Sequence, residues 1–220
     1  MTSPSWPVRT SPPFFGRFWR AVTEIAWFRY YGDRRETSFG LEDFDHYPKG
    51  TGCLLLRTEL MRGAMAEFRS RVGDDRLVND DTAVMRRIAE DHRIWLAPTF
   101  GCTYEPRTTA KGFFKQVFYR GTTFYDGFSV PGTRFTALVR AFPLATIAGV
   151  LVALRWPRTL LASALLPVAS LAFALRRKVD AGDALLLSAL SLPFAAVSSL
   201  GICRGVIKHR LNGGQEETPK

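Results

Sequence analysis

Residues 185–202 read LLLSALSLPFAAVSSLGI and contain no charged side chain. A helix in a soluble protein needs a polar face, and this stretch offers only serine and glycine for one. The apolar run extends from Ala184 to Val206, which is close to the ~20 residues that cross a ~30 Å hydrocarbon layer. It predicts a membrane-spanning helix, and a soluble helical bundle is the less favoured alternative.

Two further apolar segments, Phe135–Leu154 and Thr159–Leu175, precede this one and approach the same length. Arg140 and Pro143 interrupt the first of them, so it is also interpretable as an interfacial or hairpin element. We therefore predict a transmembrane helical region over 134–210.

The composition changes near the start of this region. Charges of both signs are mixed among the apolar residues before it, which predicts a folded domain over 14–133. Residues 1–13 are rich in proline and serine and are expected to be irregular. Residues 211–220 form a polar tail.

The formal net charge is +10, from 30 Lys and Arg against 20 Asp and Glu. The basic residues do not form one dense run but flank the apolar segments, as at Arg155, Arg158, 176–178 and 208–210. Such an arrangement is typical of charges that meet lipid headgroups. We predict membrane lipid, and no nucleic acid, as a partner. Basic residues on both sides of each segment leave the topology open.

The N-terminus has no apolar stretch after its first charge, so no secretory signal is expected. Cys53, Cys102 and Cys203 lie far apart in the sequence and form no Cys-x-x-Cys motif, so we expect neither a disulfide nor a zinc site. The soluble part should then be cytoplasmic, in a multi-pass protein of the cytoplasmic (inner) cell membrane.

Short helical and strand patterns alternate in the folded domain, which favours an α/β class with a mixed sheet and flanking helices. The expected helices are Phe14–Tyr31, Thr58–Arg69, Asp81–Asp91 and Thr109–Phe128, and the expected strands are Gly52–Arg57, Arg93–Pro98 and Thr99–Tyr104. The first and last helices combine aromatic and basic residues. They are therefore interpretable either as helices on a membrane surface or as helices packed under the domain.

Two adjacent carboxylates, Asp80 and Asp81, stand at the start of one predicted helix. They have a structural explanation, because acids at this position cap free N–H groups and complement the helix dipole. A functional explanation is also open, since an aspartate at the mouth of a cleft can accept a proton from a substrate hydroxyl.

The order of several motifs resembles the acceptor-binding, C-terminal half of membrane-associated, inverting family 2 glycosyltransferases of GT-A type. Lys49–Arg57 (KGTGCLLLR) is followed by Asp80-Asp81-Thr82, and then by Arg93-Ile94 leading to Pro98. The stretch Tyr104–Gln116 is similar to the one that precedes the Gln-x-x-Arg-Trp signature of processive members. The resemblance covers roughly Tyr47 to Gly121.

The resemblance implies that Asp81 is the catalytic base, which deprotonates the acceptor hydroxyl for attack at the anomeric carbon, with Asp80 in support. It implies substrate-binding roles for Gln116, Tyr119, Arg120 and Gly52. Tyr119 and Arg120 stand where Arg and Trp follow in the signature, which puts processive polymerisation in doubt. Arg120 could still face a diphosphate leaving group, or simply lipid headgroups.

Members of this family also carry a nucleotide-binding half that ends in an Asp-x-Asp motif and holds a divalent cation, Mg or Mn. Only 46 residues precede Tyr47, too few for that half. Asp43-Phe44-Asp45 has the letters of the motif, but no apolar strand precedes it, so we interpret it as a loop coincidence.

The expected function is therefore sugar transfer in cell-envelope glycan or glycolipid synthesis. The donor would be a nucleotide- or polyprenyl-linked sugar, and the acceptor a membrane-proximal glycan or lipid. A separate polypeptide would supply the donor-binding half. The alternative is a non-catalytic membrane partner, or scaffold subunit, derived from a truncated glycosyltransferase.

Overall fold

A computed structural model describes residues 2–5, 13–68, 80–102, 105–128 and 136–212. Residues 1–69 and 80–108 form one compact unit, and 70–79 with 109–220 form a second. The chain thus divides at Thr109 and not near residue 134, because the helix that follows Thr109 groups with the apolar helices. The described residues are mostly helical (74%), and the predicted α/β character is reduced to one small sheet.

The sheet of the first unit is built around strand β3 (Ile94–Gly101), in the order β1-β3-β2. Strand β2 (Thr37–Phe39) pairs antiparallel with β3, with Ser38 opposite Trp95. Strand β1 (Thr2–Ser5) runs parallel to β3, and its register shifts between Ser3 and Ser5. An intervening proline has no N–H for the ladder, as suits an edge strand. Part of the N-terminus predicted to be irregular is therefore extended, because backbone pairing with an open edge needs no apolar pattern.

Five helices complete the described part of the first unit. Four of them confirm the helices predicted there, and the fifth, a short 3₁₀ helix, lies where Asp43-Phe44-Asp45 was interpreted as a loop. The predicted Phe14–Tyr31 helix divides at Trp27 into two. The bounds are α1 (Phe14–Ala26), α2 (Phe28–Tyr31), the 3₁₀ helix η1 (Leu41–His46), α3 (Thr58–Glu67) and α4 (Asp80–Asp91).

The predicted strand Gly52–Arg57 is wrong. Gly52 and Cys53 lie in a turn, and only Leu55 makes an isolated bridge. Leu56 packs against the α3–α4 cluster, whereas the Leu55 side chain is 65% exposed. The apolar run is therefore covered on one side only, and it does not form the buried strand that its composition suggests.

Helix α4 contributes to two core clusters in the described part of the first unit. Met85 and Ala89 are buried with aromatic and aliphatic side chains of α2, β2, η1 and β3, namely Tyr30, Phe39, Phe44, Ile94 and Leu96. Val84 and Ile88 pack against Ala64 of α3. Val84, Met85 and Ile88 thus lie on the buried side of this helix. Each such large apolar side chain stabilises the fold by roughly 1.5–3 kcal/mol when fully buried.

Arg93 ties β2 and η1 to the start of β3. Its Nη1 donates to Glu42 Oε1 (2.8 Å), its Nε to Ser38 Oγ (3.0 Å) and its Nη2 to the Ser38 carbonyl (3.1 Å). Arg93 belongs to one of the motifs that carry the family resemblance, and these hydrogen bonds give it a structural role.

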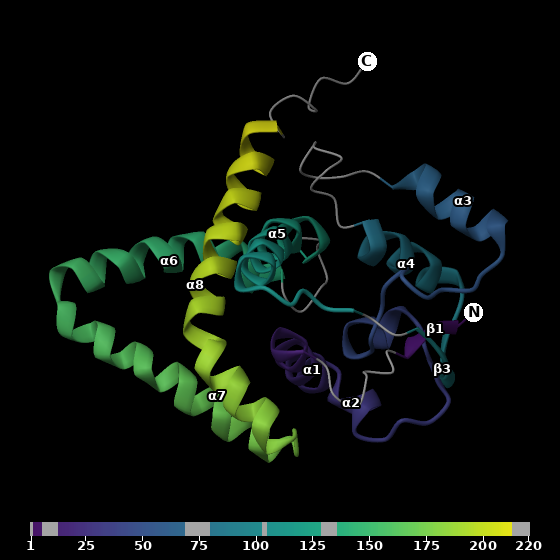
Figure 1. The fold of residues 1–220 in the computed structure, drawn as a ribbon. Helices are drawn as coiled ribbons and strands as arrows, with labels where there is room; N and C mark the ends of the chain where they lie inside the picture. The colour runs from purple at the N-terminus through teal and green to yellow at the C-terminus, as the bar shows by residue number, and fades with distance from the viewer. Residues whose placement is uncertain (1, 6–12, 69–79, 103–104, 129–135, 213–220) are drawn as a thin grey trace. The chain divides into compact units, whose positions relative to one another are not determined.

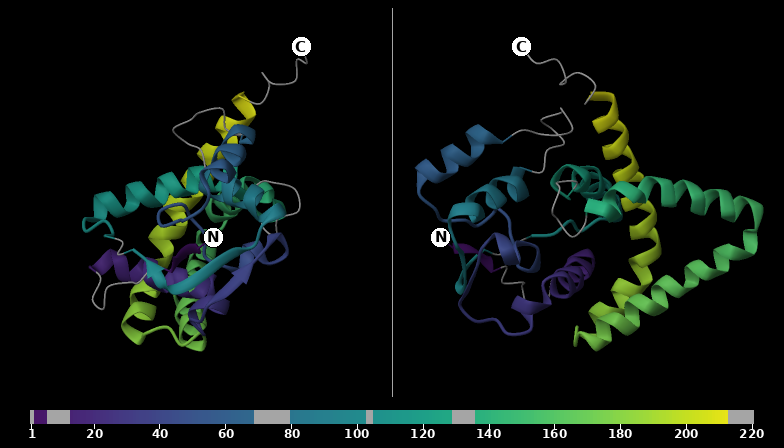
Figure 2. Two further views of the ribbon diagram at one scale, coloured as in Figure 1. Left: turned by 90° about the vertical axis from the view of Figure 1, so that its right-hand side faces the viewer. Right: turned by 180° about the vertical axis from the view of Figure 1, so that it is seen from behind.

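The second unit consists of helices, which confirm the apolar segments predicted from sequence. They are α5 (Ala110–Phe128), α6 (Thr136–Arg155), the 3₁₀ helix η2 (Pro157–Ala164), α7 (Leu165–Arg176) and α8 (Ala181–Asn212). Helix α6 leads away from the middle of α8, and η2 with α7 return to the first turns of α8 (Figure 1), as the view from behind also shows (Figure 2).

Hydroxyl groups along α8 bond to nearby carbonyls. Ser191 donates to the Ser188 carbonyl (2.7 Å) and Ser199 to the Ala195 carbonyl (2.6 Å). Ser188 donates across to the Pro167 carbonyl of α7 (2.8 Å). At the helix start, Asp180 Oδ1 accepts from the backbone N–H groups of Gly182 and Asp183, which caps α8.

Helices α5 and α8 cross at two glycines. A Cβ at Gly121 would lie 2.6 Å from the Ser198 carbonyl oxygen, and a Cβ at Gly201 would overlap the Phe118 carbonyl oxygen. Both obstacles are backbone atoms, which do not swing aside as a flexible side chain does. The crossing therefore requires residues without side chains, as close helix contacts in membrane proteins commonly do.

We predict that Gly201→Val lowers the thermal unfolding midpoint of the detergent-solubilised chain, because the added methyl groups force α5 and α8 apart. Overpacking of this kind costs about 1–3 kcal/mol. Gly149→Ala on α6 is the matched control, because a Cβ there meets nothing within 4 Å. An equal midpoint for the two variants would contradict the close crossing.

Candidate functional site

Asp81 lies in the first turn of α4 and is half-buried. The Thr51 hydroxyl donates a hydrogen bond to Asp81 Oδ1. One turn further along α4, the Gly50 N–H donates a hydrogen bond to Met85 Sδ, with 3.0 Å between the nitrogen and the sulfur. The structure thus brings the Lys-Gly-Thr motif against the start of α4, although 30 residues separate Thr51 from Asp81 in the sequence.

Two other predicted site residues flank this contact. Asp80 is the first residue of α4, and its side chain lies outside the described part of the chain. Gly52 is exposed in the turn after Thr51, where a Cβ would meet nothing within 4 Å. The position has room for a side chain, so the local fold does not require glycine there. The role of Gly52 in substrate binding stays a prediction.

The Phe44 ring of η1 is in contact with two cations. Lys49 Nζ is 4.5 Å from the centre of the Phe44 ring and donates to the carbonyls of Phe44 (2.5 Å) and Tyr47 (3.2 Å). The Arg86 guanidinium carbon is 4.4 Å from the same ring. Cations over an aromatic face are attracted by its quadrupole. These contacts hold Lys49, two residues before Thr51, and Arg86, five residues after Asp81, against the same ring.

Each carboxylate of Asp43-Phe44-Asp45 is paired with its own arginine. Asp45 Oδ1 is 3.0 Å from Arg86 Nη2, with side chains 14% and 17% exposed. Asp43 Oδ1 is 3.2 Å from Arg29 Nη1. Two carboxylates neutralised in this way do not fit a divalent-cation site. Among the described residues no group of three or more His, Cys, Asp or Glu side chains is placed to hold a metal ion.

Three predicted site residues lie on α5, in the second unit. Gln116 is half-buried, Tyr119 is 45% exposed, and Arg120 is exposed. Asp81 and Gly52 belong to the first unit, so the predicted site residues fall into two groups, one in each unit. Of the contacts expected around the predicted site, the structure describes the one between Asp81 and Thr51 in the first unit.

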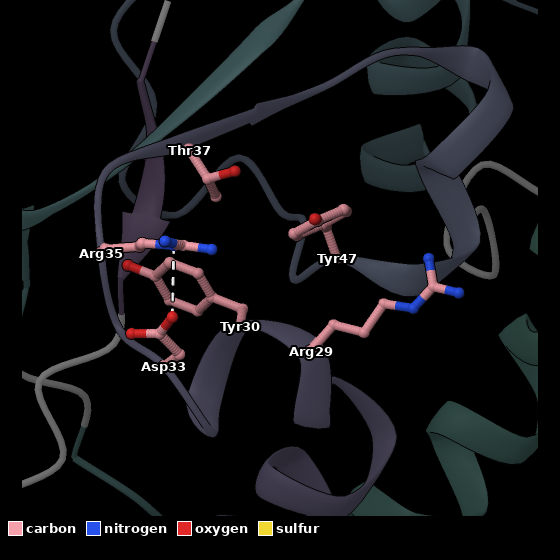
Figure 3. A pocket seen from close by; sticks show the side chains of 6 residues that line it. All are labelled: Arg29, Tyr30, Asp33, Arg35, Thr37 and Tyr47. Atoms are coloured by element: carbon pink, nitrogen blue, oxygen red, sulfur yellow. Dashed lines mark ion pairs between the residues drawn. The ribbon is translucent and has the colours of Figure 1, made fainter.

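A small pocket in the first unit lies among Arg29, Tyr30, Asp33, Arg35, Thr37 and Tyr47, none of which was predicted as a site residue (Figure 3). Its cavity volume is ≈ 70 Å³, whereas ligand sites usually enclose ~300–1,000 Å³. Arg35 Nε is 3.2 Å from Asp33 Oδ2 beside the Tyr30 ring, and the Arg29 side chain leads away from that pair (Figure 3). The positive charges are therefore already balanced, and the pocket is too small and open for a sugar nucleotide.

Cys53 and Cys102 lie within hydrogen-bonding reach of each other. Partial burial, and then the neighbouring Cys102 thiol, raise the pKa of the Cys53 thiol. Their spacing of 49 residues hid this contact at the sequence level, because it depends on the turn at Gly52 meeting the segment after β3. Both thiols are free and half-buried.

We predict that mild oxidation with diamide links Cys53 to Cys102, because the two thiols are close enough in the fold to affect each other. Mass spectrometry of the digested chain should show the two peptides joined with the loss of two hydrogens. Cys203 on α8 is the internal control and should still react with iodoacetamide. Separate alkylation of Cys53 and Cys102 after oxidation would contradict the contact.

We predict that Arg86→Met destabilises the chain by about 1.5–3 kcal/mol, as expected for the loss of a hydrogen bond between charged groups that leaves Asp45 part-buried. Arg35→Met is the matched control, because its ion pair with Asp33 is largely exposed and contributes less than about 1 kcal/mol. Unfolding of the detergent-solubilised chain followed by tryptophan fluorescence measures both. Equal losses of stability in the two variants would show that the Arg86–Asp45 pair stabilises the chain no more than the exposed Arg35–Asp33 pair does.

Two helices of the described part are long and apolar enough to cross a membrane. They cover Pro157–Arg176 and Ala181–Arg210, and only 6% and 22% of their most apolar windows are buried. The core helix of a soluble protein would be mostly buried. Both helices instead expose leucine and valine side chains, including Leu161, Val168, Leu185 and Leu200, which weakly supports membrane association.

Searches against models of protein families, curated proteins and solved structures found no match to this chain.

Proposed function

We propose that the chain is the acceptor-side part of a membrane-associated, inverting glycosyltransferase. The Thr51–Asp81 hydrogen bond is the observation that carries this proposal. It joins two of the motifs on which the family resemblance rests, and it holds a half-buried carboxylate at the start of α4.

In the proposed reaction Asp81 takes the proton of an acceptor hydroxyl as the oxygen attacks the anomeric carbon of the donor sugar. The bond from that carbon to the phosphate leaving group breaks from the opposite side, with inversion. A carboxylate in this role typically contributes a factor of about 10²–10⁴ to the rate. The substrate-binding roles that the family resemblance implies for Gln116, Tyr119 and Arg120, all on α5 of the second unit, stay predictions.

The donor is proposed to be a nucleotide- or polyprenyl-linked sugar, and the acceptor a glycan or lipid of the cell envelope. Asp43 and Asp45 are held by arginines, so the divalent cation is proposed to bind elsewhere. A separate polypeptide is proposed to supply both that cation site and the donor-binding half. The apolar helices would keep the reaction at the inner membrane.

A non-catalytic scaffold is the second candidate. It is favoured by the ion pairs that already engage Asp43 and Asp45 and by the absence, among the described residues, of a metal-binding group. In that case the Thr51–Asp81 bond serves only to hold a loop against α4.

We predict that Asp81→Asn lowers sugar transfer by the complete assembly by at least about 100-fold, in line with loss of a general base. Asparagine keeps an oxygen that can accept from Thr51, so the local fold should persist. Asp91→Asn, at the exposed far end of α4, is the matched control. Incorporation of radiolabelled nucleotide sugar into membranes measures the rate.

Membranes that lack the chain complete the experiment. If Asp81→Asn retains full turnover while removal of the chain abolishes it, the chain is a required scaffold and Asp81 has no catalytic role. Unchanged incorporation without the chain would remove it from the reaction altogether.

A further inference from the structure

The long helix α8 is divided by its charges. Between Asp183 and Arg204 lie 20 uncharged residues, which rise about 30 Å in an α-helix and so match the ~30 Å hydrocarbon layer. The helix continues beyond Arg204 to Asn212, with Lys208 and Arg210 on the way. Those last turns extend past the length that lipid tails can cover.

Helix α5 crosses α8 at one edge of this uncharged stretch. Gly201, which contacts Gly121 of α5, lies three residues before Arg204. The Arg204 guanidinium carbon is 5.5 Å from the Phe118 ring of α5. Lys111 and Lys115 on α5 are exposed. An amphipathic helix with aromatic and basic residues at this level fits the interface between headgroups and tails.

Helix α7 returns along α8 in the opposite direction. Ser188 of α8 contacts Pro167 of α7, and only residues 177–180 separate the two helices. Together η2 and α7 rise about 34 Å at the usual 3₁₀ and α increments. If α8 crosses the bilayer, η2 and α7 cross it too, and Pro157 lies on the same face as α5.

Both ends of α6 then lie on one face. Its start at Thr136 follows the end of α5, and its end at Arg155 precedes η2. A helix with both ends on one face does not cross. The apolar run of α6 is also interrupted in the sequence by Arg140 and Pro143.

We infer that the chain crosses the bilayer twice, through η2–α7 and through α8, while α5 and α6 lie along the face at which the first crossing starts and the second ends. Among the described residues of the second unit, the turn at residues 177–180 reaches the other face. Basic residues are more numerous on the α5 face, including Lys111, Lys115, Arg155, Arg158, Arg204, Lys208 and Arg210, than around the turn, where Arg176, Arg177 and Lys178 lie. By the positive-inside rule this face is cytoplasmic. The inference is independent of the proposed glycosyl transfer.

Single cysteines test this arrangement in the full chain, after Cys53, Cys102 and Cys203 are replaced by serine. The informative variants are Lys111→Cys on α5, Arg158→Cys at the start of η2 and Arg177→Cys in the turn, all at exposed positions. A membrane-impermeant maleimide is applied to intact bacterial cells producing the chain and to inside-out vesicles. Arg177→Cys should react in the cells, and the other two only in the vesicles.

Two results would overturn the inference. If Arg158→Cys reacts from the same side as Arg177→Cys, α6 crosses the membrane and there are three spans. If all three positions react from one side, the α7–α8 hairpin does not cross. Green fluorescent protein fused to the C-terminus of the otherwise unaltered chain gives a second readout that does not depend on the cysteine-free background. It should fluoresce, and a dark fusion present at normal abundance would place the C-terminus outside the cytoplasm.

Discussion

Helix α4 is the element on which the first unit depends, because it is buried on two faces at once. Met85 and Ala89 close the cluster over the sheet, and Val84 and Ile88 close the cluster with α3. The same helix carries Asp81 and Arg86, so the contacts to Thr51 and Asp45 are as rigid as the core beneath them. Any chemistry at Asp81 is therefore supported by apolar packing that also holds the small sheet in place.

The helices were largely predictable from the sequence, since apolar residues recur at helical spacing and that pattern is local. The run Cys53–Leu56 was not, because a short apolar stretch does not reveal whether one or both of its sides will be covered. Strand β1 was equally hidden, because its pairing with β3 uses backbone groups that every sequence has. The grouping of α5 with α8 depends on two glycines 80 residues apart, which have no periodicity to mark them.

The candidate site was predictable in its acids but not in its supports. Asp81 stands at a recognisable helix start, whereas the hydroxyl of Thr51 became meaningful only when the turn folded back onto α4. Asp45 read as part of a possible metal motif, and its pairing with Arg86, 41 residues away, assigns it to packing. Sequence patterns indicate which residue types are present, but long-range pairing decides whether a carboxylate is occupied or available.

The serine hydroxyls of α8 have a consequence for how this helix meets its surroundings. Ser188, Ser191 and Ser199 each direct the hydroxyl hydrogen to a carbonyl within the α7–α8 pair. A donor that is already engaged has little to gain from a new acceptor on another molecule. To a neighbour these positions resemble small apolar residues, so any protein that assembles against them would be selected by the shape of the helix surface and not by polar complementarity.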